Sequence, residues 1–208
     1  MNLVIFGATG GTGRLLVEQA LEQGHNVTAF ARNPAAVTAQ HPNLKVVQGD
    51  ALDYASVEPV VKGKEAVLSA LGVRKLGRTT VLSEGTRNIL MAMEQHGVKR
   101  LIVESSLGVG DSKGQFPWYL GIMVRVFLRN IYADKEVQER FIRASGVDWT
   151  IVRPAGLTNG PRTGVYRQWV GVPDSPIKGW ISRADVAEFM LRQLNDDTHL
   201  RQAVGLSY

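Results

Sequence analysis

Cysteine is absent from this chain of 208 residues. Its absence excludes a disulfide, a thiolate metal site and a cysteine nucleophile, and it fits a reducing compartment. The four histidines (His25, His41, His96 and His199) show no ligand spacing, and no cluster of carboxylates accompanies them. We therefore expect no metal site.

The chain also lacks a long apolar run and a targeting signal. It begins Met-Asn-Leu before a strand-like pattern, without the basic region and apolar core of a signal peptide. Its longest apolar-rich stretch, near residues 118–128, is interrupted by Arg125 and is too short to span a bilayer. We therefore expect no integral membrane segment and a cytoplasmic location.

Charges of one sign do not form runs, although the net charge is +5. Arg125, Arg129, Arg140 and Arg143 are spaced as on a solvated helix face. No nucleic-acid-binding motif is present, so no nucleic-acid partner is expected. The composition, 44% hydrophobic and 21% charged, is ordinary for a globular protein, and the length suits one domain over residues 1–208.

A dinucleotide-binding pattern occupies the first 32 residues. The apolar run Leu3-Val4-Ile5-Phe6 leads into Gly7-Ala8-Thr9-Gly10-Gly11-Thr12-Gly13, and a helix-like stretch and a second apolar run, 27–31, follow. Strand, glycine turn, helix and strand in this order are typical of a βαβ unit that binds a dinucleotide. An ordinary glycine-rich turn is the alternative.

The residues of this turn have distinct expected roles. Gly7 permits the tight turn, Gly10 lets the backbone approach a pyrophosphate, and Gly13 allows the helix to pack closely on the sheet. With Gly11 and Thr12, they place the phosphates at the free N–H groups and the positive end of the helix dipole.

The end of the second strand indicates which dinucleotide binds. An NAD site usually has Asp or Glu there, but this chain has no acidic residue between Glu22 and Asp50. It has Arg32 instead, and a guanidinium suits a 2′-phosphate. We therefore expect NADP(H), with Arg32 and Thr9 near that phosphate; a solvated surface arginine is the competing interpretation.

Strand-like and helix-like stretches alternate along the whole chain. The expected strands cover residues 3–6, 27–31, 44–48, 66–71, 101–103, 149–152 and 165–170, with an edge strand at 203–206. The expected helices cover residues 15–24, 54–61, 79–96 and 182–195, with a further one that begins in the apolar stretch 118–131 and continues to 145–146. This pattern predicts an α/β fold: a single-domain, Rossmann-type, doubly wound parallel sheet with helices on both faces.

Ligands of such a sheet bind beyond the carboxyl ends of its strands. The candidate cofactor contacts at those ends are Asp50 and Ala51 for adenine, Leu71 and Gly72 for the nicotinamide ribose, and Ser105 and Pro154. The irregular segments 107–130 and 155–180 are expected to wall a substrate pocket. Their aromatic residues favour a flat, partly apolar molecule, unless they belong to the core; they are Trp118, Tyr119, Phe127, Tyr166 and Trp169.

Three motifs resemble the atypical short-chain dehydrogenase/reductases. They are the glycine turn with Arg32, the Ser-Glu-Gly-Thr-Arg-Asn motif at 83–88 and the Ile-Ser-Arg-Ala-Asp-Val-Ala motif at 181–187. Within that group the chain is most similar to the family of biliverdin-IXβ reductase, also called NADPH-dependent flavin reductase, over nearly its whole length. This resemblance implies an NADPH-dependent reductase. It also places a functional serine at Ser106, to position the nicotinamide or to bind the substrate.

The chain departs from these relatives in two respects. The segment after Ser106 is longer and more apolar, and Ala155 stands where the family has a histidine. Ordinary short-chain dehydrogenases use Tyr-x-x-x-Lys, whereas this chain has Tyr132-Ala133-Asp134-Lys135, which is one residue shorter. Residues three apart still share a helix face, so Tyr132 stays a candidate proton donor. Lys135 is a candidate for holding ribose hydroxyls, with a solvated helix lysine as the alternative.

We therefore predict an NADPH-dependent reductase that transfers hydride to a planar conjugated acceptor such as FMN, FAD or biliverdin. Such rings delocalise the added charge and can take a proton from water, so proximity and orientation supply most of the catalysis. The alternatives are a non-catalytic NADP(H)-binding redox sensor or assembly or regulatory protein, and a quinone reductase. A monomer or weak homo-oligomer is expected.

Overall fold

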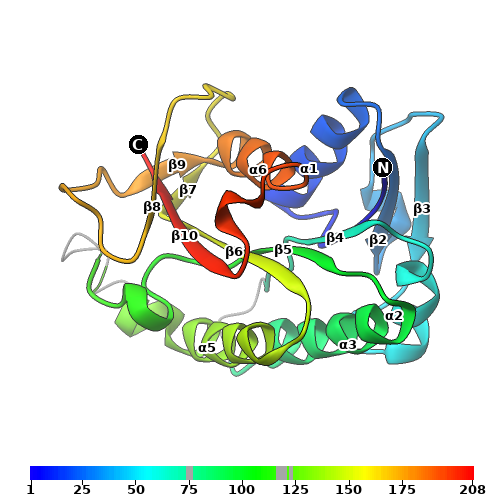
Figure 1. Cartoon of the computed structure of the whole chain (residues 1–208), viewed down its shortest axis with the longest axis horizontal. Coiled ribbons are helices and arrows are strands. Elements are labelled where there is room, and N and C mark those ends of the chain that lie inside the picture. The colour runs from blue at the N-terminus through cyan, green and yellow to red at the C-terminus, as the bar shows by residue number, and fades with distance from the viewer. Residues whose placement is uncertain (74–76, 116–120, 122–123) are drawn as a thin grey trace.

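The computed structural model describes residues 1–73, 77–115, 121 and 124–208, with residues 124 and 125 as backbone only. Eight strands form one sheet in the order β3-β2-β1-β4-β5-β6-β10-β8 (Figure 1). These strands are Asn2–Phe6 (β1), Asn26–Ala31 (β2), Leu44–Gln48 (β3), Ala66–Ser69 (β4), Arg100–Glu104 (β5), Asp148–Pro154 (β6), Arg167–Val170 (β8) and Gln202–Ser207 (β10). All neighbours run parallel except β8, which is antiparallel to β10. Two short strands, Gly156–Thr158 (β7) and Trp180–Ser182 (β9), pair separately.

Helices cover both faces of the sheet, as predicted. They are Gly11–Glu22 (α1), Tyr54–Val61 (α2), Val81–His96 (α3), Arg129–Ala144 (α5) and Arg183–Arg192 (α6). In Figure 1, α1 and α6 lie on one face, and α2, α3 and α5 lie on the other. A π-helix, Val124–Leu128, precedes α5. The predicted doubly wound α/β fold is confirmed.

The strands are apolar on both sides because both sheet faces are covered. Along β1, Leu3 and Ile5 pack with α1 and α6, whereas Val4 and Phe6 pack with the helices of the opposite face. All four side chains are fully buried. This explains why the central strands appear in the sequence as continuous apolar runs rather than as alternating patterns.

Two of the predicted helix ends have the expected chemistry. The hydroxyl oxygen of Ser182 accepts the N–H of Asp185 at 3.0 Å and so caps α6. Helix α3 ends at Gly97, whose φ of 67° lies in the left-handed region that favours glycine. Local sequence signals therefore determined where these helices begin and end.

Two expectations about the C-terminal region were wrong. The strand predicted at the edge, 203–206, lies inside the sheet as β10, between β6 and β8, and β8 forms the edge. Strand β8 pairs antiparallel with β10 and so covers its outer side. The local periodicity of residues 203–206 does not indicate this partner. Helix α6 ends at Arg192, short of residue 195, because the next turn tightens: the N–H of Asn195 donates to Arg192 O at 3.2 Å.

The strand order places the site. From β1 the chain adds β2 and β3 on one side, and it then returns to add β4, β5 and β6 on the other side of β1. The order of the strands therefore reverses between β1 and β4. Carboxyl ends of parallel strands meet at the same edge, so the loops that follow β1, β4 and β5 converge at this switch point.

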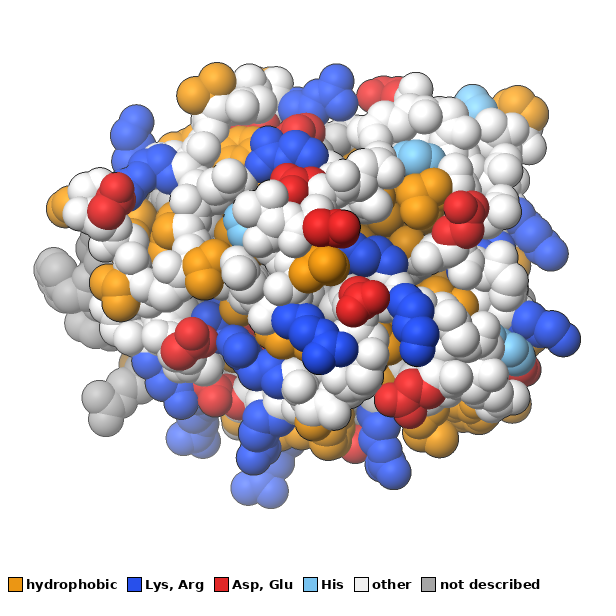
Figure 2. All heavy atoms as spheres, in the orientation of Figure 1, with side chains coloured by type: hydrophobic (Ala, Val, Ile, Leu, Met, Phe, Trp, Pro, Cys, Tyr) orange, Lys and Arg blue, Asp and Glu red, His pale blue; other side chains and the backbone are white. Residues whose placement is uncertain are grey.

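Charged side chains are dispersed over the face seen in Figure 2, with Lys and Arg interspersed among Asp and Glu.

Candidate functional site

The glycine turn after β1 has the geometry that its sequence predicts. Gly7 has a φ of 76°, and a Cβ there would lie 2.2 Å from the carbonyl oxygen of Ala70. The N–H of Gly10 donates to Gly7 O at 2.9 Å, which closes the turn. At Gly13 a Cβ would lie 2.0 Å from the same Gly7 oxygen. The close packing that requires Gly13 is therefore against the turn itself.

The N-terminus of α1 is suited to an anion. Its N-cap residue, Gly10, provides no side-chain hydrogen bond, and the first turn of the helix carries no acidic residue. The leading N–H groups and the positive end of the helix dipole therefore point into the switch point without a competing carboxylate on the helix. These residues fit the diphosphate of a dinucleotide.

The residues predicted around the adenosine half lie at the same edge. Arg32 is exposed directly after β2, and Thr9 lies half-buried in the glycine turn of the adjacent strand. Asn88 of α3 donates to Ala51 O at 2.9 Å. A Cβ at Gly85, also on α3, would lie 3.2 Å from both Ala51 and Leu71 side chains. Helix α3 thus brings the ends of β3 and β4 together.

Asp50 and Gly72 complete this side of the site. The Asp50 carboxylate accepts the N–H of Leu52 at 3.1 Å, which shapes the turn after β3. Gly72 is exposed, and no atom lies within 4 Å of where its Cβ would be. The space at Gly72 is therefore open to solvent or to a ligand.

A buried carboxylate at the end of β5 was missed in the sequence. Thr12 of the glycine turn donates to Glu104 Oε1 at 2.9 Å, and both side chains are buried. Burial raises the pKa of Glu104, against the opposing effects of Lys135, of the Thr12 hydrogen bond and of Arg183. The available signal was an acidic residue that ends an otherwise apolar strand. Through this contact β5 supports the cofactor turn.

Lys135 is buried rather than solvated, so the alternative of a surface lysine is wrong. Its exposed fraction is 9%, and burial lowers its pKa against the attraction of Glu104, Glu139 and Asp134. Glu104 ends β5, so Lys135 of α5 interacts electrostatically with a carboxylate at the switch point. Its ammonium has three N–H donors, which suit ribose hydroxyls.

Tyr132 and Ser106 meet at the same place. Tyr132 donates to Leu107 O at 3.1 Å and also hydrogen-bonds Ser106. Burial raises the pKa of Tyr132 to about 12, and the Ser106 hydrogen bond opposes that rise. Tyr132 therefore keeps its proton at neutral pH. The intervening Asp134 instead accepts the N–H groups of Leu82 and Ser83, at 2.9 and 3.1 Å, and so caps α3.

Ser105 faces away from this cluster. Its side chain is buried and donates to Glu139 Oε1 at 2.7 Å, and the same oxygen accepts Arg153 Nε at 3.0 Å. Arg153 also donates to Asp111 Oδ1 at 2.6 Å. The Ser105 side chain thus points at α5, where it joins an ion-pair network, and the cofactor role of Ser105 stays a prediction.

The prediction that aromatic side chains line a substrate pocket is corrected for Tyr166. Tyr166 packs edge-on against Phe189 of α6, with ring centroids 6.1 Å apart, and hydrogen-bonds Glu188, so it belongs to the core periphery. Phe127 is 61% exposed. Trp169 covers Gly205 and donates to Gln115 Oε1 at 3.2 Å. Trp118 and Tyr119 lie outside the described residues.

The two predicted pocket segments nevertheless meet. Besides Trp169, Gln115 contacts Gly171 by donating to its carbonyl oxygen at 2.8 Å. Pro154 ends β6 and accepts the N–H of Leu107 at 3.0 Å, which ties the loop after β5 to the loop after β6. Both segments therefore border the carboxyl edge of the sheet, next to Ser106.

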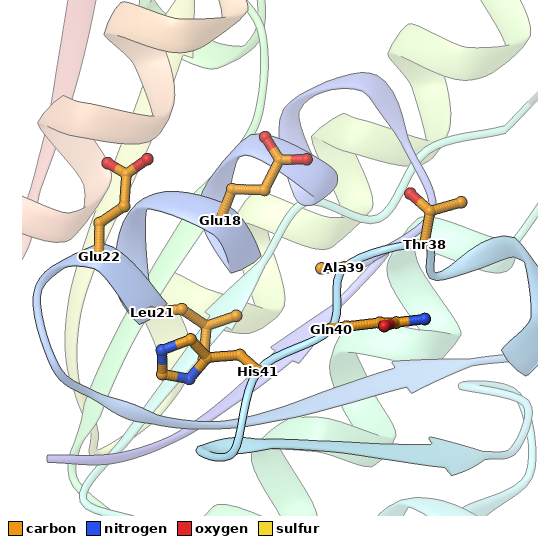
Figure 3. A pocket seen from close by; sticks show the side chains of 7 residues that line it. All are labelled: Glu18, Leu21, Glu22, Thr38, Ala39, Gln40 and His41. Carbon is orange, nitrogen blue, oxygen red and sulfur yellow. The ribbon is translucent and has the colours of Figure 1, made fainter.

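A cavity of about 400 Å³ lies elsewhere (Figure 3). It is lined by Glu18, Leu21, Glu22, Thr38, Ala39, Gln40 and His41. These residues come from the later turns of α1 and from the loop that leads into β3, which is the edge opposite the glycine turn. Two carboxylates on its wall disfavour phosphate groups, so this cavity is not the cofactor site.

Within the described part of the chain, no group of three or more His, Cys, Asp or Glu side chains is placed to hold a metal ion. No helix there is long and apolar enough to cross a membrane.

The comparisons with known proteins agree with this geometry. A family model described as NAD(P)H-binding matches residues 7–197. An uncharacterised chloroplastic protein of Arabidopsis thaliana is 33% identical over 205 residues, which cover 93% of this chain and 71% of that protein. The photosystem II assembly factor Ycf39 of Synechocystis is 26% identical, over 97% of this chain and 61% of its own length. The crystal structure of ChuY, an anaerobilin reductase of Escherichia coli O157:H7, has a TM-score of 0.81 and 26% identity, and covers 100% of this chain and 97% of that one.

The chain belongs to the NAD(P)H-binding family. This confirms the predicted nicotinamide cofactor and the resemblance to atypical short-chain dehydrogenase/reductases. The fold and cofactor class are those of an NAD(P)H-dependent oxidoreductase. The acceptor, the oligomeric state, the cytoplasmic location and the roles of individual site residues stay predictions.

Proposed function

We propose that this protein is an NADPH-dependent reductase that passes hydride to a planar conjugated acceptor, a flavin or a bilin. One observation carries the proposal. The hydroxyls of Ser106 and Tyr132 meet at the carboxyl end of β5, and Lys135 of α5 interacts electrostatically with Glu104 at the same strand end. The Thr12–Glu104 hydrogen bond joins this strand end to the dinucleotide turn.

The cofactor would be held by residues from both halves of the sheet. The uncapped N-terminus of α1 suits the diphosphate, Arg32 the 2′-phosphate, and Asp50 and Ala51 the adenine. Leu71 and Gly72 would border the nicotinamide ribose. Lys135 would donate to ribose hydroxyls. When bound, NADPH supplies the hydride that the reaction transfers.

The chain's own contribution is orientation. Ser106 is half-exposed and hydrogen-bonded to Tyr132, so its hydroxyl is fixed where it can position the nicotinamide or the acceptor. Tyr132 is protonated at neutral pH, as tyrosines ordinarily are, and burial raises its pKa further, to about 12. A conjugated acceptor places weak demands on a proton donor, since the ring delocalises the added charge. The similarity to an anaerobilin reductase supports a bilin among such acceptors.

The experiment is a panel of acceptors with the purified protein. NADPH oxidation is followed at 340 nm with FMN, FAD, biliverdin or a simple quinone, and NADH serves as the control cofactor. NADPH-specific turnover of a flavin or bilin is the expected result. Turnover of the quinone alone would replace the proposed acceptor class by quinones.

A second candidate is supported by the similarity to an assembly factor. In that case the chain binds NADP(H) as a structural or sensing ligand without transferring hydride. The same panel separates the two candidates: tight NADPH binding without oxidation by any acceptor contradicts the reductase and supports the assembly or sensing role.

A further inference from the structure

Arg183 lies over the dinucleotide turn although it is far from it in sequence. It is the first residue of α6, and its side chain occupies the space beside Gly11: a Cβ at Gly11 would lie 2.7 Å from both Cδ and Nε of Arg183. Its Nη1 donates to Asn159 Oδ1 at 2.6 Å. The guanidinium is therefore held between the N-terminus of α1 and the loop that follows β7.

The backbone that carries Arg183 is fixed on several sides. Asp185 is buried two residues after Arg183. Its carboxylate accepts hydrogen bonds from the N–H groups of Thr163 and Gly164, at 2.7 and 2.9 Å, and from the Tyr208 hydroxyl, at 2.6 Å. On the side of α1, Gln19 donates to Ala184 O at 3.0 Å. The start of α6 is thus tied to α1, to the 163–164 loop and to the C-terminal strand end.

The local charge favours an anion. Arg183 and Lys135 both act electrostatically on Glu104, which is the carboxylate beneath the glycine turn. Glu104 already accepts a hydrogen bond from Thr12. Arg183 lies directly beside the free N–H groups of α1, and a guanidinium together with these N–H groups suits a diphosphate.

We propose that Arg183 binds the diphosphate of the dinucleotide, while Arg32 binds its 2′-phosphate. This inference rests on the NADP(H) binding in the proposed function. A guanidinium can donate two parallel hydrogen bonds to phosphate oxygens, and here it is already positioned over the helix N-terminus. Glycine is then required at position 11, because a side chain there would displace Arg183. The two arginines would then bind different phosphates: Arg183 the diphosphate that NADPH and NADH share, and Arg32 the 2′-phosphate that only NADPH carries.

The test compares three ligands on two variants. Binding of NADPH and NADH is measured by calorimetry, and binding of adenosine 2′-monophosphate, which lacks the diphosphate, by NMR titration. Arg183→Met should weaken NADPH and NADH equally, by about tenfold or more, and leave adenosine 2′-monophosphate unchanged. Arg32→Ala should weaken NADPH and adenosine 2′-monophosphate and leave NADH unchanged.

Arg201→Met is the matched control, since Arg201 is an exposed arginine at the start of β10, on the opposite edge of the sheet. It should bind all three ligands like the wild type. Unchanged NADPH and NADH affinity in Arg183→Met overturns the proposal, as does an equal loss for adenosine 2′-monophosphate.

If Arg183→Met does not fold, Arg183→Lys is the second variant, because it keeps the positive charge but lacks the two parallel N–H donors of the guanidinium. A loss of affinity confined to the two dinucleotides supports the proposal, and wild-type affinity for both contradicts it. Failure of the wild type to bind either dinucleotide would instead refute the proposed function.

Discussion

At the scale of single residues, the most informative contact is the hydrogen bond between Tyr132 and Ser106. Tyr132, Asp134 and Lys135 of the Tyr-Ala-Asp-Lys segment on α5 each contact a different part of the structure. Tyr132 turns to the end of β5, Asp134 caps α3, and Lys135 is buried beside Glu104. The shortened motif therefore still places a tyrosine and a lysine at the switch point, by geometry that differs from an i, i+4 pair.

Ser106→Ala tests whether that hydroxyl acts in the reaction. Turnover should fall by about tenfold or more, since a hydrogen bond to the reacting groups is lost, whereas NADPH affinity should stay unchanged. Steady-state kinetics and NADPH titration measure the two effects separately. Ser145→Ala, at the distant end of α5, is the control. Wild-type turnover in Ser106→Ala would remove Ser106 from the mechanism.

Arg32→Ala tests the choice of cofactor. Loss of a charge-assisted contact of about 1.5–3 kcal/mol should weaken NADPH binding tenfold or more and leave NADH nearly unchanged. The exposure of Arg32 at the end of β2 makes a direct effect on folding small. Fluorescence titration with both cofactors measures the difference. Equal losses for NADPH and NADH would contradict the assignment.

At the scale of elements, the junction of β1 and α1 leaves no room for a side chain at Gly7 or Gly13. The turn is so tight that Gly7 approaches Ala70 and Gly13 approaches Gly7, in both cases backbone to backbone. Backbone atoms cannot move aside as a flexible side chain can. The same tightness points the helix N-terminus at the switch point, so stability and cofactor binding depend on one piece of geometry.

Gly13→Ala should therefore affect both properties. Its Cβ would lie 2.0 Å from Gly7 O, and relieving that overlap should lower the free energy of unfolding by about 1–3 kcal/mol and weaken NADPH binding. Gly146→Ala is the control, because no atom lies within 4 Å of the added Cβ. Urea denaturation and NADPH titration are the measurements. A Gly13→Ala protein with wild-type stability would show that the turn is looser than described.

At the scale of the whole molecule, Asp185 joins segments that are distant in sequence. It is buried and connects α6, the 163–164 loop and the C-terminal residue Tyr208. Burial acts to raise its pKa, but hydrogen bonds from Tyr208, Gly164 and Thr163 outweigh burial and hold the pKa below its ordinary value. An ionised carboxylate thus stabilises the first turn of α6, which carries Arg183.

The sign of the pH dependence follows from this depression. A carboxyl whose pKa is lower in the folded state stabilises fully above its unfolded pKa, near 3.9, and loses that contribution as pH falls through the folded pKa. Asp185→Asn should lower the free energy of unfolding at pH 7 by about 1–3 kcal/mol and flatten its fall below about pH 4. Denaturation at several pH values measures this. Exposed Asp174→Asn should change little, and an unchanged acid profile in Asp185→Asn would contradict the role.

The local pattern of the chain determined the βαβ unit, the central strands, the helix caps at Ser182 and Gly97, and the cofactor class. Those features depend on apolar periodicity and on glycine at positions where backbone conformation or contact demands it, and both are visible within a few neighbouring residues. The candidate contacts at the strand ends could also be predicted, because the carboxyl ends of parallel strands share one edge.

Only the tertiary structure decided which side chains reach that edge. It buried Lys135 beside Glu104, turned Ser105 toward Glu139, moved Tyr166 into the packing of α6 and placed β10 inside the sheet. It also brought Arg183 over Gly11. Each of these outcomes depends on the packing of segments that are distant in sequence, and no local periodicity specifies which distant partner a side chain will meet.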